Sequence, residues 1–206
     1  MRERRTPTAV LTLLAVLCLS SGGAPPAAFV RSESGALAAD APWTPEVPAI
    51  EHGLDALGTL LPPLERSRVA RAIAQEARRA GFSTEFVLAV IRIESAGDPF
   101  AMSPKGALGL MQLRPRTAEF VARARGVRWS GPETLFDPVV NVRLGVAYLE
   151  YLRARYGNLA IALAAYNWGP TRISEMLRRS QPIPVGYSQR VLEACRGHAV
   201  AVGRSA

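Results

Sequence analysis

The sequence contains few of the residues that build metal sites and disulfide frameworks. Its 206 residues include two histidines, His52 and His198, and two widely separated cysteines, Cys18 and Cys195. Protein metal sites of the zinc type need clustered Cys or His ligands, so the sequence predicts no metal site, and it implies no cofactor. Cys18 lies in an apolar N-terminal segment. If that segment is removed, Cys195 is the only thiol and no internal disulfide can form.

Lysine is almost absent, although the chain is basic. Lys105 is the one lysine among 25 basic residues, and the formal net charge is +8. A basic surface favours an anionic polymer such as a cell wall, a membrane face or a nucleic acid, but an Arg-rich solvated surface explains the charge equally well. Neither a basic–aromatic patch nor a zinc pattern supports nucleic-acid binding, so no nucleic-acid partner is predicted.

Apolar runs long enough for a spanning helix of about 20 residues are also absent. The uncharged segment 9–19 is shorter, follows a start with three arginines, and precedes a stretch of small residues. This order predicts a secretory signal peptide over residues 1–24. Cleavage after residue 24 or 28 fits, residue 38 is a more distant alternative, and an uncleaved anchor or lipidation at Cys18 are the competing interpretations. We therefore expect an exported, periplasmic protein that meets the membrane only through its signal peptide before cleavage.

The remaining chain divides into a linker and one helical domain. Residues 25–64 are rich in Pro, Ala, Gly and Ser without a sustained period, which predicts a disordered linker. From residue 67 onward apolar residues recur at the i, i+3, i+4 spacing of amphipathic helices. Residues suited to N-cap or N1 positions mark the expected helix starts: Ser83, Pro115, Asp137, Asn158 and Pro170. No internal repeat and no credible strand pair are found, so we predict an all-α domain over residues 65–200.

Glu94 is the first candidate for chemistry. It lies near the end of a predicted helix whose other residues are mostly valine, leucine and isoleucine. Burial among apolar side chains raises the pKa of a carboxyl group, and the negative end of the helix acts in the same direction. A raised pKa suits a general acid at neutral pH, although a lone helical glutamate is more often a surface or ion-paired residue. Asp98, the next acid along the chain, is interpreted as a turn residue before Pro99.

Two short strings downstream carry groups that suit a sugar ligand. Residues 106–112 contain two glycines and no charge, and the Gln112 amide can both donate and accept hydrogen bonds. Residues 164–170 place Tyr166, Asn167 and Trp168 together at a helix end, where aromatic faces and amides can pack on and bind sugar rings. Taken alone, each string is equally compatible with a tight turn or a helix end.

The three strings together resemble one known family. Glu94-Ser95, the Gly-Leu-Met-Gln string at 109–112, and the Ala-Tyr-Asn-Trp-Gly string at 165–169 have the order and spacing of the lytic transglycosylase domain of the lysozyme superfamily. The sequence between these motifs is similar to that family too, and the resemblance covers about residues 67–195. It implies a lysozyme-like globular helical domain with a substrate cleft.

The resemblance also implies roles for individual residues. Glu94 matches the single catalytic acid/base of the family. The positions implied to bind substrate are Ser95, Gly109, Met111, Gln112, Tyr166, Asn167, Trp168 and Tyr187. Two departures stand out: Trp168 occupies a position where many members have alanine, and the three residues before Tyr187 differ from the acidic residue and threonine that members often carry.

The implied reaction is cleavage of a peptidoglycan glycan strand. Glu94 would protonate the oxygen of the β-1,4 bond between N-acetylmuramic acid and N-acetylglucosamine, then accept the proton of the muramic C6 hydroxyl as a 1,6-anhydro ring closes. An ordinary glycosidase needs two carboxyl groups, whereas this reaction needs one and consumes no water. The alternatives are a hydrolytic muramidase of the same fold and a wall-positioned accessory protein of a secretion or conjugation machine.

Overall fold

The computed structural model of the chain describes residues 46–202, with side chains described as far as residue 196. This part consists of helices and loops, with two isolated β-bridges in the loop after the third helix and no strand. The all-α prediction is confirmed. The elements are α1 (Val47–Ala56), α2 (Pro63–Ala80), α3 (Thr84–Ser95), α4 (Pro115–Arg125), the 3₁₀ helix η1 (Pro132–Phe136), α5 (Pro138–Tyr156), α6 (Leu159–Trp168), α7 (Pro170–Arg178) and α8 (Gly186–Val202).

The predicted helix starts are confirmed by their capping contacts. The Ser83 side chain accepts a hydrogen bond from the Phe86 N–H, the Asp137 carboxylate accepts from two backbone N–H groups, and Asn158 caps α6 in the same way. Pro115 and Pro170 stand at the first positions of α4 and α7. A proline there costs nothing because its missing N–H would have no partner inside the helix.

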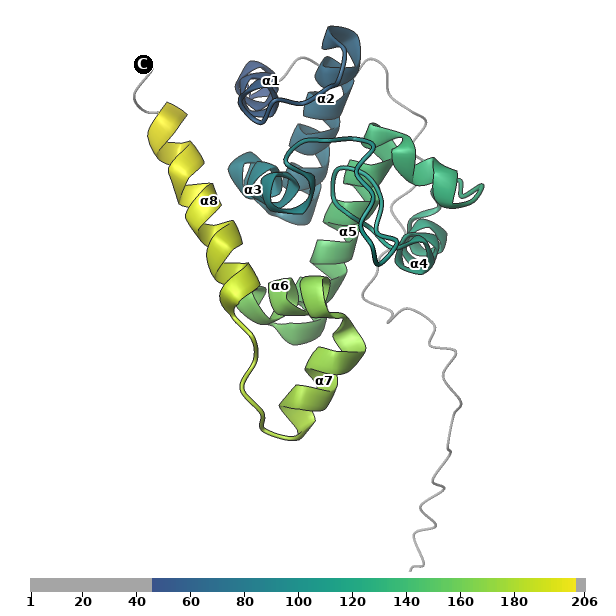
Figure 1. Cartoon of the computed structure of the whole chain (residues 1–206), viewed down its shortest axis with the longest axis vertical. Coiled ribbons are helices and arrows are strands. Elements are labelled where there is room, and N and C mark those ends of the chain that lie inside the picture. The colour runs from purple at the N-terminus through teal and green to yellow at the C-terminus, as the bar shows by residue number, and fades with distance from the viewer. Residues whose placement is uncertain (1–45, 203–206) are drawn as a thin grey trace, which may run out of the picture.

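Helix α5 lies between the two halves of the hydrophobic core. Its residues Val142, Val146 and Leu149 belong to a cluster that also contains buried side chains of α2 and α3. Leu144 and Leu152, on another face, pack with residues of α4 and α6. Figure 1 shows α5 in the middle of the domain, with α8 running beside α3.

The predicted linker is wrong in its C-terminal part. Residues 47–56 form α1, whose side chains Val47, Ile50 and Leu54 are buried against α2 and α3. These residues have the i, i+3, i+7 spacing of a helix face, but the prolines and small residues around them hide this short pattern in the average composition. Helix α2 likewise begins at Pro63, four residues before the expected start. The signal peptide and residues 25–45 lie outside the described residues.

A group of buried charges links α2, α4 and α5. Glu76 of α2 is buried and contacts Arg79 at 2.7 Å, Arg143 at 3.4 Å and Arg125 at 3.9 Å. Arg79 and Arg125 also contact Glu150, at 2.8 and 3.8 Å. Three guanidinium groups and two carboxylates thus share one site, where each buried charge has an opposite charge beside it.

Candidate active site

Glu94 occupies the last turn of α3, where the helix is stopped by local backbone geometry. Ala96 adopts the left-handed conformation with φ of 52°, and Gly97 follows with φ of 86°. The Asp98 carboxylate accepts a hydrogen bond from the Phe100 N–H at 2.8 Å, which confirms its predicted place in a turn. Glu94 is therefore held at a fixed helix end, with the chain turning away beyond it.

The carboxyl group of Glu94 meets a tyrosine from the far end of the sequence. Tyr187, in the first turn of α8, is 3% exposed and donates its hydroxyl to Glu94 Oε1 at 2.5 Å. Helix α8 packs along α3, and this packing brings the two residues together. Tyr187 had the weakest support among the implied site residues, and the structure gives it the most direct contact with the candidate acid.

Burial dominates the electrostatics of Glu94. Loss of solvation raises the pKa of its carboxyl group from 4.5 to about 7, although the Tyr187 hydrogen bond and the positive charge of Arg190 both act to lower it. The raised pKa confirms the direction expected from the apolar sequence around Glu94. No other carboxylate is among the groups that shift this pKa, so the described residues provide one acid at this place rather than a pair.

The loop at 108–113 is held by Asn141, a residue to which the motifs assigned no role. Asn141 is fully buried on α5. Its side-chain oxygen accepts a hydrogen bond from the Met111 N–H at 2.8 Å, and its amide donates to the carbonyl oxygens of Leu108 and Leu135, both at 2.9 Å. An amide among the valines and leucine of the first turns of α5 was the signal that could have identified it, because buried amides need partners.

Gly109 and Met111 contact the protein interior rather than the cleft. A Cβ atom on Gly109 would lie 2.2 Å from the Asn141 amide nitrogen and 2.5 Å from the Leu135 carbonyl oxygen, so this glycine permits close approach to Asn141. The Met111 side chain is fully buried and packs where Gly145 has no side chain. The Met111 side chain thus points inward, and substrate binding at Gly109 and Met111 stays a prediction that only the backbone of this loop could fulfil.

Ser95 connects the end of α3 to the same loop. Its hydroxyl lies 2.8 Å from the Leu110 carbonyl oxygen and 3.2 Å from that of Ile91, and it accepts a hydrogen bond from the Gly97 N–H at 3.2 Å. Tyr166 makes a second connection by donating its hydroxyl to the Met111 carbonyl oxygen at 2.7 Å. The neighbours of Glu94 are thus fixed by backbone contacts, and substrate binding by Ser95 stays a prediction.

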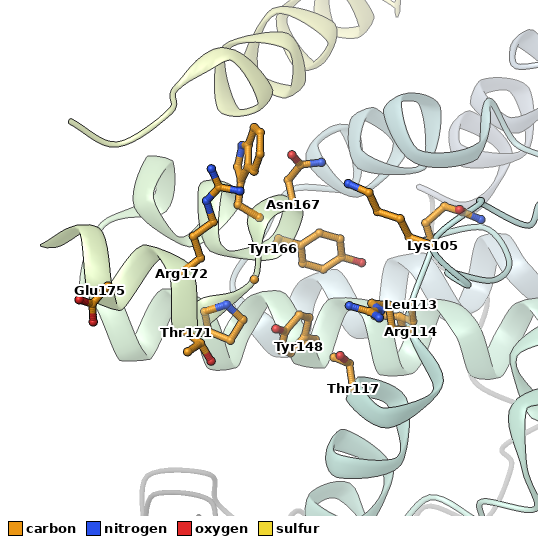
Figure 2. A pocket seen from close by; sticks show the side chains of 14 residues that line it. Lys105, Leu113, Arg114, Thr117, Tyr148, Tyr166, Asn167, Thr171, Arg172 and Glu175 are labelled. Carbon is orange, nitrogen blue, oxygen red and sulfur yellow. The ribbon is translucent and has the colours of Figure 1, made fainter. Parts of the chain in front are cut away.

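A cleft of about 740 Å³ opens beside this framework. It is lined by residues from the loop before α4 and from α4, α5, α6 and α7, including Gln112, Tyr166, Asn167 and Trp168 (Figure 2). Gln112 donates its amide to the carbonyl oxygens of Ala101 and Gly109, at 2.9 and 3.0 Å. The structure therefore brings four of the implied substrate-binding residues to one surface.

Glu94 is not among the residues that line this cleft, whereas Tyr166 is, and the charge of Glu94 acts on Tyr166. Burial raises the pKa of the Tyr166 hydroxyl well above its usual value, and the Glu94 charge acts in the same direction. Figure 2 shows the Tyr166 ring in the centre of the cleft, between Asn167 and Tyr148. Tyr166 therefore belongs both to the cleft lining and to the electrostatic surroundings of Glu94.

The described residues show no sign of a metal centre or a membrane span. Within residues 46–202, no three His, Cys, Asp or Glu side chains are grouped so that they could hold a metal ion. In the same range, the helices are all too short or too polar to cross a bilayer.

Comparisons with known proteins agree with the motifs. The chain is 41% identical over 99 residues to a putative soluble lytic murein transglycosylase of Haemophilus influenzae, a match that covers 48% of this chain and 17% of that protein. It is 40% identical over 97 residues to the soluble lytic murein transglycosylase of Escherichia coli, which covers 46% of this chain and 15% of the relative. The match thus spans about a sixth of each relative's length.

Solved structures give the same fold. The 70 kDa soluble lytic transglycosylase of Escherichia coli superposes with a TM-score of 0.59 and 30% identity, covering 68% of this chain and 26% of that one. An inactive Glu-to-Gln mutant of the Pseudomonas aeruginosa lytic transglycosylase Slt gives 0.57 and 31%, covering 65% and 24%. The fold is therefore the lysozyme-like helical one, as the motifs implied. The model of the Transglycosylase SLT domain matches residues 71–182, and the chain belongs to that family.

Proposed function

We propose that this protein is a peptidoglycan lytic transglycosylase, which cleaves the β-1,4 bond between N-acetylmuramic acid and N-acetylglucosamine and leaves a 1,6-anhydro-muramic end. The observation that carries the proposal is the Glu94 carboxyl group: it is partly buried, loss of solvation raises its pKa to about 7, and no other carboxylate is among the groups that shift this pKa. The family's activity is consistent with this arrangement, and the inactive Pseudomonas mutant shows that its relative depends on a glutamate.

The first step uses Glu94 as an acid. With a pKa of about 7, a large fraction of the carboxyl groups still carries the proton at neutral pH. That proton goes to the glycosidic oxygen, the bond from this oxygen to the muramic C1 breaks, and the N-acetylglucosamine unit leaves with a 4-hydroxyl. The Tyr187 hydroxyl then stabilises the carboxylate that remains, because its hydrogen bond favours the charged form.

The second step uses the same group as a base. The muramic C6 hydroxyl attacks C1 and gives its proton to the Glu94 carboxylate, so the anhydro ring closes and the acid is regenerated. The nucleophile belongs to the substrate, and an intramolecular attack has a high effective molarity when water is kept away. This explains how one carboxyl group can suffice where an ordinary glycosidase uses two.

Product analysis tests the proposal against a hydrolytic muramidase. Purified protein is incubated with peptidoglycan sacculi, and the soluble products are identified by mass spectrometry. Anhydro-muramic ends support the proposal, whereas reducing muramic ends would show that water is the acceptor. Glu94→Gln should abolish product formation, and Glu85→Gln, on the first turn of the same helix, should retain it. An active Glu94→Gln protein would refute the single-carboxyl mechanism.

We also propose that the protein acts after export, in the periplasm. The support is the signal-peptide pattern of residues 1–24, which lies outside the described residues, together with the location of the proposed substrate outside the cytoplasm. N-terminal sequencing of the protein from a periplasmic extract should reveal cleavage after residue 24, 28 or 38. Recovery of the uncleaved chain in the membrane fraction would contradict this. A role beside a secretion or conjugation machine stays a prediction.

A further inference from the structure

The cleft is lined by more basic than acidic side chains, and the basic ones form no ion pairs within the described part of the chain. Its lining includes three basic side chains, Lys105, Arg114 and Arg172, and one acidic side chain, Glu175. Glu175 is already paired with Arg178 and Arg179, one on each carboxylate oxygen. None of the three lining cations forms an ion pair within the described part of the chain, so they are available to an anionic ligand.

Arg172 is held in place by an aromatic residue. Its guanidinium carbon lies 4.5 Å from the centroid of the Trp168 ring, on the cleft wall, and Trp168 itself is 42% exposed. A guanidinium group that lies over a ring uses its face for this contact and leaves the N–H groups at its edge free to bind a carboxylate. Stacking also limits the motion of the side chain, so less freedom is lost when a ligand binds.

Figure 2 shows how these groups surround the cleft. In this view Arg172 and Lys105 lie on opposite sides of the Tyr166 ring, with Asn167 above it and Arg114 on the side of Lys105. An aromatic ring and a side-chain amide can hold a sugar unit, and the surrounding cations can then reach an acidic substituent attached to that sugar.

We propose that Trp168, Arg172, Lys105 and Arg114 form a subsite for a sugar unit whose peptide stem presents free carboxylates. This inference rests on the proposed function, because it assigns the ligand of the same cleft. Trp168 packs on the sugar ring, and Arg172 binds a carboxylate through the edge of its guanidinium group.

A carboxylate on such a strand can come from two sources. In a peptide-bearing strand the lactyl group of the muramic unit is bound to the peptide as an amide, and the free carboxylates belong to the stem. In a strand stripped of peptide the lactyl carboxylate itself is free. We assign the stem as the source, since the cations are spread around an opening of about 740 Å³ rather than gathered at one point.

Binding can be measured without turnover in the full-length Glu94→Gln protein. The probes are three soluble glycan fragments of equal length: peptide-bearing, peptide-bearing with its carboxylates converted to amides, and peptide-stripped. Arg172→Gln should weaken binding of the first about fivefold, the size expected for one exposed charge contact. It should leave the amidated fragment unchanged, Arg172→Lys should recover part of the loss, and Trp168→Ala should weaken all three. Arg71→Gln, an exposed position on α2, is the matched control.

The outcomes separate this inference from the proposed function. Equal binding of all three fragments overturns the subsite. An equal loss of affinity with Arg172→Gln and Arg71→Gln overturns it too, because the effect then comes from the net charge of the protein rather than from a contact in the cleft. A loss confined to the stripped fragment overturns the stem as the source. Since no step of this measurement depends on bond cleavage, a missing anhydro product in the sacculus assay would contradict the proposed reaction and leave the subsite result standing on its own.

Discussion

The Glu94 carboxyl group differs from a surface glutamate through its surroundings. Burial raises its pKa to about 7, while the Tyr187 hydroxyl and the Arg190 charge oppose that shift. Removing either opposing group therefore leaves burial to raise the pKa further. The pH at which the group loses its proton is thus set mainly by burial, and Tyr187 and Arg190, both on α8, lower it.

The pH dependence of activity should follow this pKa. The first step needs the protonated acid, so the rate of anhydro-product formation should be high below pH 7 and fall as the pH rises through about 7. Tyr187→Phe removes the hydrogen bond that favours the carboxylate and should move this fall to higher pH. The measurement is the initial rate between pH 5 and 9, and a fall at the same pH in both proteins would contradict the role of Tyr187.

The same pKa predicts a cost in stability. Below pH 4.5 the group is protonated in the folded and the unfolded chain, so it contributes no difference. Between pH 4.5 and about 7 the unfolded chain loses the proton first, and folding becomes less favourable as the pH rises. At pH 8 the penalty is about 3 kcal/mol. Thermal unfolding of Glu94→Gln should thus match that of the wild type at pH 4 and exceed it at pH 8. A constant difference across this range would refute the assignment.

The sequence identified Glu94 and the motif positions, but it could not assign the direction of each side chain. Gln112 and Tyr166 line the cleft as predicted. The side chain of Met111, which belongs to the same motif as Gln112, is instead buried. The contact of Tyr187 with Glu94 spans 93 positions of the chain. Such a pair depends on helix packing, which local sequence patterns do not describe.

The loop at 108–113 depends on three contacts made by one amide. Asn141→Ala would leave the Met111 N–H and the carbonyl oxygens of Leu108 and Leu135 without this partner. The Leu108 carbonyl oxygen keeps its hydrogen bond from the Leu113 N–H. Unpaired buried polar groups cost about 1–3 kcal/mol each, so for the other two groups we expect a loss of about 2–6 kcal/mol in unfolding free energy, measured with urea. Activity should fall even at temperatures where the variant stays folded, because the loop binds Ser95 and Tyr166. Full activity in a folded variant would contradict this positioning role.

Helix α1 shows how a short element can escape a prediction based on composition. Three buried residues within ten are too few to dominate a segment that is otherwise rich in proline and alanine. In the structure, the buried side chains of α1 belong to the hydrophobic core.

Substitutions in α1 test this directly. Leu54→Ala deletes a fully buried side chain and should cost about 3 kcal/mol of unfolding free energy. His52→Ala, at an exposed position of the same helix, should change stability by less than about 0.5 kcal/mol. Both values come from urea unfolding, and equal effects of the two changes would show that α1 is not packed on the domain in solution.

Across the whole molecule, the buried charges around Glu76 join three helices that are distant in sequence. The sequence shows many arginines but gives no indication that Arg79, Arg125 and Arg143 meet at one carboxylate. This arrangement arises from the packing of α2, α4 and α5, and it could not be predicted from the charge count.

Removing the shared carboxylate should destabilise the domain strongly. Glu76→Ala leaves three partly exposed guanidinium groups with Glu150 as the remaining acid of the group, and loss of the hydrogen bonds to a charged group costs about 1.5–3 kcal/mol. Glu119→Ala, which removes one exposed ion pair with Arg123, should cost less than about 1 kcal/mol. A melting temperature for Glu76→Ala close to that of the control would refute the structural role of this group.

Glu94 and Tyr187 lie 93 positions apart in the chain, and this separation affects when the proposed acid can form. In a chain that is still extended, Glu94 is an ordinary glutamate and is ionised at neutral pH, so it has no proton to give. Its pKa rises only when the folded helices bury it, and the contact with Tyr187 forms only when α8 packs against α3. The proposed acid is thus a property of the folded domain, and an unfolded chain lacks the protonated carboxyl group that the proposed reaction needs.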